Sequence, residues 1–122
     1  MDHSAMTPDA MKRRTKQFAL RTLRLTSSLP QTPEAQTIRR QLCRSATSVG
    51  ANYRAAQRGR STNEFKAKMG IVLEEADESG FWLELIIDAG MLPPGQVTSL
   101  RQEADEICAI VYTAVQRAGK QA

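Results

Sequence analysis

The sequence has few of the residues on which catalytic sites depend. Histidine occurs once, as His3, aromatic residues make up 5% of the chain, and the seven glycines lack the spacing of a phosphate-binding loop. A di-metal carboxylate site in a helical bundle needs two Glu-x-x-His pairs. A serine or cysteine nucleophile needs a base beside it, most often histidine. We therefore expect no enzyme activity, no metal and no cofactor.

Long apolar runs are also missing. No stretch approaches the roughly 18 apolar residues of a membrane span, and no apolar core follows the basic N-terminal residues as in a secretion signal. The two cysteines, Cys43 and Cys108, lie within helical patterns, which is typical of reduced, partly buried thiols. These features predict a cytoplasmic protein without membrane contact.

Helix-forming residues, chiefly Ala, Leu, Arg, Glu and Gln, dominate the chain. Thr7 and Thr32 each precede a proline and an acidic residue, a pattern typical of a capped helix start. Ser61 forms a capping box with Glu64, and a Pro-Pro-Gly step follows the third segment. These signals predict helices at about 8–27, 33–58, 62–90 and 95–118.

Apolar residues recur at steps of three and four in each segment, as on the buried face of a bundle helix. In the first segment Met11, Phe18 and Leu25 lie seven residues apart. Helices joined by short connections pack antiparallel. We therefore expect an all-α fold, an antiparallel up-down-up-down four-helix bundle, as a single domain over residues 1–122 with an ordered core at about 8–118.

Some apolar residues lie off these faces. Leu20 and Leu23 lie among the basic residues of the first helix, and Ile71, Trp82 and Leu85 lie away from the main apolar face of the third. Two such patches on a small bundle indicate a second buried surface, and so a homo-oligomer. The alternative is that the third helix is more fully covered by its neighbours.

Residues 44–52 are small and polar although they lie in mid-helix. Arg44, Ser48 and Asn52 share one flank of the second helix, and Glu75 and Glu78 lie on the matching flank of the third. A charge inside a bundle must be paired, so we expect a buried polar network that fixes the packing register or a subunit contact. The alternative is a ligand pocket.

The charge is distributed unevenly along the chain. Residues 1–60 hold 12 Lys/Arg and 3 Asp/Glu, a net charge of +9, whereas residues 61–122 hold 5 and 10, a net charge of −5. The imbalance indicates either an acidic partner such as nucleic acid or neutralisation of one half by the other. No aromatic residues interleave with the arginines, so nucleic-acid contact would be led by phosphates. The predicted contact residues are Lys12, Arg13, Arg14, Lys16, Arg21, Arg24, Arg39, Arg40, Arg54, Arg58 and Arg60.

Several short motifs occur together in one order along the chain. They are Gln41-Leu42-Cys43-Arg44-Ser45, Ser48-Val49-Gly50-Ala51-Asn52, Ala56-Gln57-Arg58, Glu75-Ala76-Asp77-Glu78, Trp82-Leu83-Glu84-Leu85 and Asp88-Ala89-Gly90. With these motifs the chain resembles, over about residues 10–118, the bacterial four-helix-bundle proteins first noticed as products of intervening sequences in 23S ribosomal RNA genes. The accessory variability determinants of diversity-generating retroelements belong to the same superfamily. Ala55 departs from the glutamate common in the family.

The resemblance implies up-down bundles that assemble as ring-like homopentamers, with no catalytic activity attached to the family. The retroelement relatives are basic and bind nucleic acid and a reverse transcriptase. The leading hypothesis is therefore a non-enzymatic homo-oligomer, most simply a pentamer, that binds DNA, RNA or a nucleic-acid enzyme through its first two helices. The alternative is a structural oligomer or adaptor that binds another protein without nucleic-acid contact.

Overall fold

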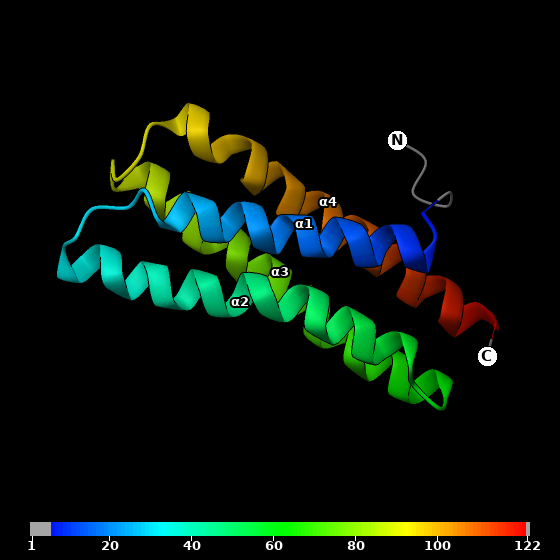
Figure 1. Cartoon of the computed structure of the whole chain (residues 1–122). Coiled ribbons are helices and arrows are strands. Elements are labelled where there is room, and N and C mark those ends of the chain that lie inside the picture. The colour runs from blue at the N-terminus through cyan, green and yellow to red at the C-terminus, as the bar shows by residue number, and fades with distance from the viewer. Residues whose placement is uncertain (1–5, 122) are drawn as a thin grey trace.

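The structure, a computed structural model, describes residues 6–121 and contains four helices (Figure 1). Helix α1 spans Pro8–Thr26, α2 Pro33–Gln57, α3 Thr62–Asp88 and α4 Pro94–Gln121. Each helix packs against the next and α4 returns to α1, whereas within the described residues the diagonal pairs do not approach each other. The described residues contain no strand. The predicted antiparallel up-down-up-down four-helix bundle is confirmed.

The capping residues identified in the sequence start their helices. The hydroxyl oxygens of Thr7, Thr32 and Ser61 accept backbone N–H groups three residues on, at 3.1, 3.2 and 3.1 Å. Helix α4 extends beyond its predicted end at residue 118. Helix α3 stops two residues earlier than predicted, and Gly90 follows it with a φ of 69°, a left-handed conformation that favours glycine.

Threonines share the buried face of α1 with apolar residues. Thr15 and Thr22 are fully buried beside Met11 and Phe18, whereas Leu25, expected in the core, is half-buried. The Thr15 hydroxyl donates to the Met11 carbonyl at 2.9 Å, and the Thr22 hydroxyl donates to the Phe18 carbonyl at 2.8 Å. Because each hydroxyl is satisfied within its own helix, only its methyl group faces the core, and burial carries little penalty.

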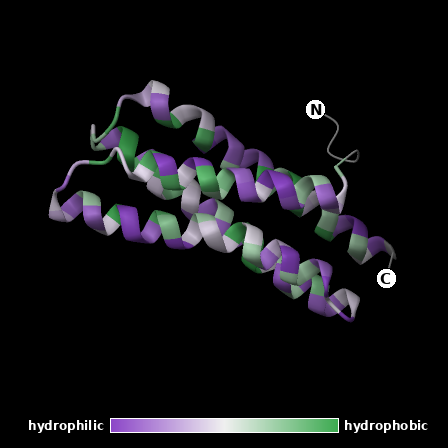
Figure 2. Cartoon of the chain, viewed as in Figure 1, coloured by the Kyte–Doolittle hydropathy of each residue, from purple (hydrophilic) through white to green (hydrophobic). Residues whose placement is uncertain are grey.

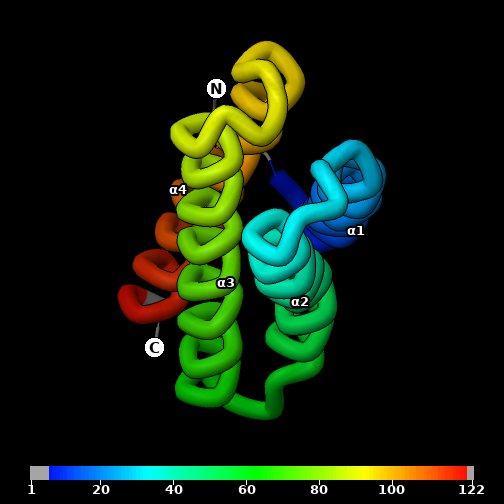
Figure 3. The backbone as a smooth tube through the Cα atoms, turned by 90° about the vertical axis from the view of Figure 1, so that its left-hand side faces the viewer, coloured from blue at the N-terminus to red at the C-terminus, as the bar shows by residue number. Residues whose placement is uncertain are grey.

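Hydrophobic and hydrophilic residues alternate around each helix (Figure 2). One continuous core of apolar residues, drawn from all four helices, fills the interior. Seen from the side, α2 and α3 run next to each other down to the turn that joins them (Figure 3). None of the four described helices combines the length and apolar composition that a membrane crossing requires.

Gly50 allows α1 and α2 to approach closely. A Cβ atom at this position would lie 3.2 Å from the Thr15 hydroxyl oxygen and 3.5 Å from its Cβ atom. Thr15 is itself fully buried and fixed by its hydrogen bond to Met11, so it has little room to move aside. The hydrogen of glycine is therefore what sets the separation of the two helices here.

We predict that Gly50→Val lowers the free energy of unfolding by about 1–3 kcal/mol, because overpacking forces the two helices apart. The matched control is Gly70→Ala in mid-α3, where a Cβ atom meets nothing within 4 Å. This control should raise stability by about 0.5–1 kcal/mol, because alanine has the higher helix propensity. Urea unfolding measures both. A Gly50→Val protein as stable as the wild type would refute the close approach.

Candidate functional site

A groove of about 520 Å³ runs between α1 and α2. Thr15 and Gly50, which are in close contact, form its floor, and four cationic side chains line its sides. The lining residues are Lys12, Thr15, Lys16 and Ala19 of α1 and Thr47, Gly50, Ala51, Arg54 and Arg58 of α2.

The helical repeat brings the four cations of this groove together. Lys12 and Lys16 are four residues apart, as are Arg54 and Arg58, so each pair lies on one face of its helix about one turn apart. Both pairs line the same groove because α1 and α2 are adjacent and antiparallel. Arg58 also caps the C-terminus of α2, where the helix dipole favours a positive charge.

No acidic residue among residues 6–121 lines this groove. Within residues 6–121, none of Lys12, Lys16, Arg54 and Arg58 forms an ion pair. Four like charges around one concave surface repel one another and concentrate a positive potential there. The groove is therefore suited to bind an anion that carries more than one negative charge.

Arg14, expected on the basic surface, turns instead towards α4. Its Nε and Nη2 atoms donate to the two carboxylate oxygens of Glu103 at 2.6 and 2.9 Å, and Nη2 lies 3.4 Å from Glu106. The Arg14 and Glu103 side chains are only 16% and 15% exposed. The hydrogen bond that Arg14 donates to Glu103 raises the pKa of Arg14. This arginine serves the fold and does not join the groove.

Two more of the predicted contact residues are engaged within the bundle. Arg39 donates to the carbonyl oxygens of Thr26 at 3.2 Å and Leu29 at 3.1 Å, which ties the end of α1 to α2. Arg21 donates to the Ser99 hydroxyl on α4. The remaining predicted contacts are exposed and lie outside the groove. They are Arg13, Arg24, Arg40 and Arg60.

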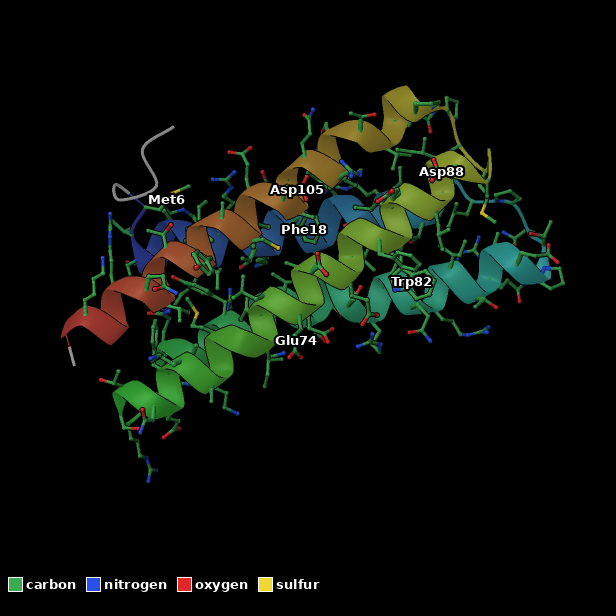
Figure 4. All side chains as sticks on the ribbon, turned by 180° about the vertical axis from the view of Figure 1, so that it is seen from behind. Met6, Phe18, Glu74, Trp82, Asp88 and Asp105 are labelled. Carbon is green, nitrogen blue, oxygen red and sulfur yellow. The ribbon has the colours of Figure 1, made fainter. Side chains whose placement is uncertain are left out.

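The structure brings Arg44 together with both predicted glutamates across α2 and α3. Its Nη1 atom lies 3.0 Å from a Glu75 carboxylate oxygen, and its Nη2 atom contacts Glu78. Trp82, which projects from α3 towards α2 (Figure 4), donates its indole N–H to the same Glu78 oxygen at 3.0 Å. The Trp82 hydrogen bond, followed by Arg44, holds the pKa of Glu78 below its ordinary value despite an opposing effect of burial.

We expected this polar cluster to be buried, but the structure shows otherwise: the Arg44 side chain is 49% exposed. Ser48 and Asn52 do not join it: the Asn52 amide donates to the Ser48 carbonyl at 2.9 Å, within α2. The buried polar contact between α2 and α3 is a different one. The Ser79 hydroxyl donates to the Ser45 hydroxyl at 2.8 Å, and both residues are fully inaccessible.

Sequence reasoning missed the role of Ser79. The residue lies three positions after Ala76 and four before Leu83, in step with the apolar face of α3. That spacing is the signal that could have identified it. Ser45 occupies the equivalent position on the apolar face of α2. A serine on the apolar face of each of two adjacent helices therefore indicates a buried pair of hydroxyl groups.

The predicted oligomer contacts fall into two groups. Leu23 and Ile71 are 42% and 38% exposed. Trp82 and Leu85 instead pack partly against the core, and Leu20 is half-buried, so part of the second apolar stripe is covered within the chain. The largest exposed apolar side chains were not predicted. They are Phe81 and Tyr112, at 52% and 57% exposure.

Within residues 6–121, no three His, Cys, Asp or Glu side chains are grouped as metal ligands would be. His3 lies outside the described residues. Cys43 and Cys108 are free and partly buried. Burial, followed by the charges of Asp77 and Asp105, raises the pKa of Cys108 to about 11, so that its thiol stays protonated at neutral pH.

Four antiparallel helices with a cationic groove define a helical-bundle protein. The chain matches, over residues 10–113, the family described as 23S rRNA-intervening sequence protein, and it belongs to that family. A solved structure from Bacteroides thetaiotaomicron, of a protein with unknown function from the S23 ribosomal protein family, is similar, with a TM-score of 0.83 and 31% identity over 91% of this chain and 99% of that one. No curated protein matches the chain. The family resemblance of the sequence is confirmed.

We predict that Arg14→Gln destabilises the bundle by roughly 2–3 kcal/mol, because Glu103 is left largely buried without its cation. The matched control is Arg44→Gln, which should have a much smaller effect because water solvates that cluster. Thermal and urea unfolding measure the difference. Equal destabilisation by the two changes would show that burial does not distinguish these ion pairs.

Proposed function

We propose that this protein is a homo-oligomer that binds nucleic acid through the groove between α1 and α2. The observation that carries the proposal is the set of four cations, Lys12, Lys16, Arg54 and Arg58, that share one concave surface without an acid among its lining residues. Phosphates of a nucleic-acid backbone are the repeated anions that such a surface fits.

The other lining residues favour contact with the backbone over the bases. Ala19, Gly50 and Ala51 are small, so a phosphate chain can approach the floor closely. The Thr15 and Thr47 hydroxyls donate to carbonyl oxygens of their own helices. The lining contains neither an aromatic ring for stacking nor an amide for base-edge recognition. The expected binding is therefore largely independent of sequence.

The second part of this proposal is that the chain assembles into a homo-oligomer. Leu23, Ile71, Phe81 and Tyr112 leave large apolar surfaces exposed on a small bundle, and burial of such surfaces drives self-association. The family resemblance implies five subunits. A ring would repeat the cationic groove once per subunit, and the repeated grooves would strengthen binding to a long polyanion.

A second function, protein binding without nucleic acid, is favoured by one feature of the opposite face. Asp77, Glu84 and Asp105 line a hollow of about 240 Å³ between α3 and α4, beside Phe81 and Arg101. Arg101 lies 3.6 Å from Glu84 and 3.7 Å from Asp105, so acids still outnumber bases around the exposed ring, which favours a basic partner protein. In that case the grooves between α1 and α2 would carry only solvated charge.

For nucleic-acid binding we predict a steep dependence on salt. Four phosphates neutralised in one groove give a log–log slope of about −3.6, so affinity for generic duplex DNA falls about 150-fold between 50 and 200 mM salt. Replacing Lys12, Lys16, Arg54 and Arg58 together by Gln should abolish most of this slope. Fluorescence anisotropy with duplex DNA and with RNA of unrelated sequences measures it.

The matched control for this experiment replaces Arg13, Arg24 and Arg40, which are exposed outside the groove, by Gln. Their loss should leave the slope nearly unchanged. If the control variant flattens the slope as much as the groove variant does, the contact lies elsewhere on the basic helices. No binding at 50 mM salt and micromolar protein would favour the protein-binding function.

We also predict that light scattering on a sizing column gives about five times the 13.5 kDa mass of the chain. Replacing the exposed Phe81 and Tyr112 by Ser should reduce this mass if their side chains lie in the subunit contact, without loss of helix content by circular dichroism. A monodisperse monomer of the unmodified chain at micromolar concentration would contradict the oligomer.

A further inference from the structure

A second groove, of about 460 Å³, lies at one end of the bundle. Figure 1 shows that α1 begins and α4 ends at this end. Met6, before the first turn of α1, stands at this end (Figure 4). All four helices contribute to the lining, which is mostly apolar. Its principal side chains are Met11, Phe65, Met69, Ile110, Val111 and Ala114. This groove shares no lining residue with the cationic groove.

Tyr53 lines this apolar groove and has an unsatisfied hydroxyl. The residue is only 5% exposed, and within the described residues its phenol oxygen makes no hydrogen bond. Burial raises the pKa of Tyr53, so the hydroxyl remains a neutral donor. A buried donor without a partner is unfavourable, and buried tyrosine hydroxyls usually have one. This unpaired hydroxyl is consistent with a site that receives its partner from a ligand.

Among residues 6–121, Arg117 is the one charged residue in the lining of this groove. It is exposed on the last turns of α4. Among the described residues Arg117 forms no ion pair. The Thr113 hydroxyl, also in the lining, donates to the Ala109 carbonyl at 3.0 Å. The available polar groups are therefore the exposed guanidinium of Arg117 and the phenol hydroxyl of the buried Tyr53.

We propose that this groove binds a small amphipathic anion, with an apolar body among Met11, Phe65 and Met69 and an acidic group at Arg117. An oxygen of the ligand accepts a hydrogen bond from the Tyr53 hydroxyl. The volume lies within the range of ligand sites, which are typically apolar with a few polar groups that fix orientation. Among the described lining residues there is one positive charge and no acid, which favours an anion over a cation or a neutral lipid.

The test uses the full chain and two kinds of probe. Anilinonaphthalene sulfonate, which has an apolar ring system and one negative charge, should bind with a rise in fluorescence. Octanoate, decanoate and dodecanoate, each below its micelle concentration, should displace it. Each methylene that becomes buried should tighten competition about fourfold. Competition that does not depend on chain length would overturn the apolar site.

Three variants locate the probe. Tyr53→Phe should weaken carboxylate binding about tenfold while the free protein melts at an equal or higher temperature, because the unpaired hydroxyl is gone. Arg117→Gln should weaken it several-fold, and Arg101→Gln, a control on the same helix outside the groove, should not change it. Unchanged affinity in both Tyr53→Phe and Arg117→Gln would overturn the proposal.

The competing occupant is residues 1–5 of the same chain, which precede Met6. If a chain that starts at Met6 binds these probes and the full chain does not, the N-terminal segment fills the groove and the proposal is overturned. Equal affinities support it. Replacing Arg54 and Arg58 by Gln should leave the probe affinity unchanged, so this result is independent of the nucleic-acid experiment.

Discussion

The ion pair between Arg14 and Glu103 joins the first helix to the fourth across the interior edge of the bundle. Helices α2, α3 and α4 pack extensively in sequence, whereas α1 meets α4 over the least extensive of the four interfaces. At that interface the Arg14 guanidinium donates hydrogen bonds to both carboxylate oxygens of Glu103. Two residues along a helix turn it by about 200°, so Lys12 and Lys16 lie on the side of α1 away from Arg14. That side faces α2, where the cationic groove is found.

Local signals in the sequence account for most of the fold. Side-chain caps start the first three helices, and the three-and-four spacing selects their buried faces. Two kinds of feature escaped prediction. Buried Thr15, Thr22 and Ser79 are polar by type and buried because their hydroxyls bond to their own helices. The partners of Arg14 and Arg39 lie on other segments, so no property of α1 or α2 alone distinguishes these arginines from the unpaired ones.

The opposite charges of the two halves of the chain neutralise each other in part within the bundle. Acids of the second half neutralise Arg14 through α4 and Arg44 through α3. Lys12, Lys16, Arg54 and Arg58 stay unpaired among the described residues, on the face that the acids do not reach. The pairing of Arg44 with the two glutamates could be predicted because these residues lie on facing sides of α2 and α3. The exposure of Arg44 could not, because it depends on how closely the two helices approach at their edges, and residue spacing does not determine that distance. The surface suited to phosphate is thus what remains after the bundle has satisfied its own charges.

Phosphate binding where α1 and α2 meet can be tested most directly by nuclear magnetic resonance. Backbone amide and arginine side-chain signals would be followed while a short DNA duplex is added at low salt. We expect the shifts to concentrate at Lys12, Lys16, Arg54 and Arg58, with Gly50 on the floor of the groove, and to disappear as salt is raised. Shifts confined to Arg13 and Arg40, or to α3 and α4, would contradict it.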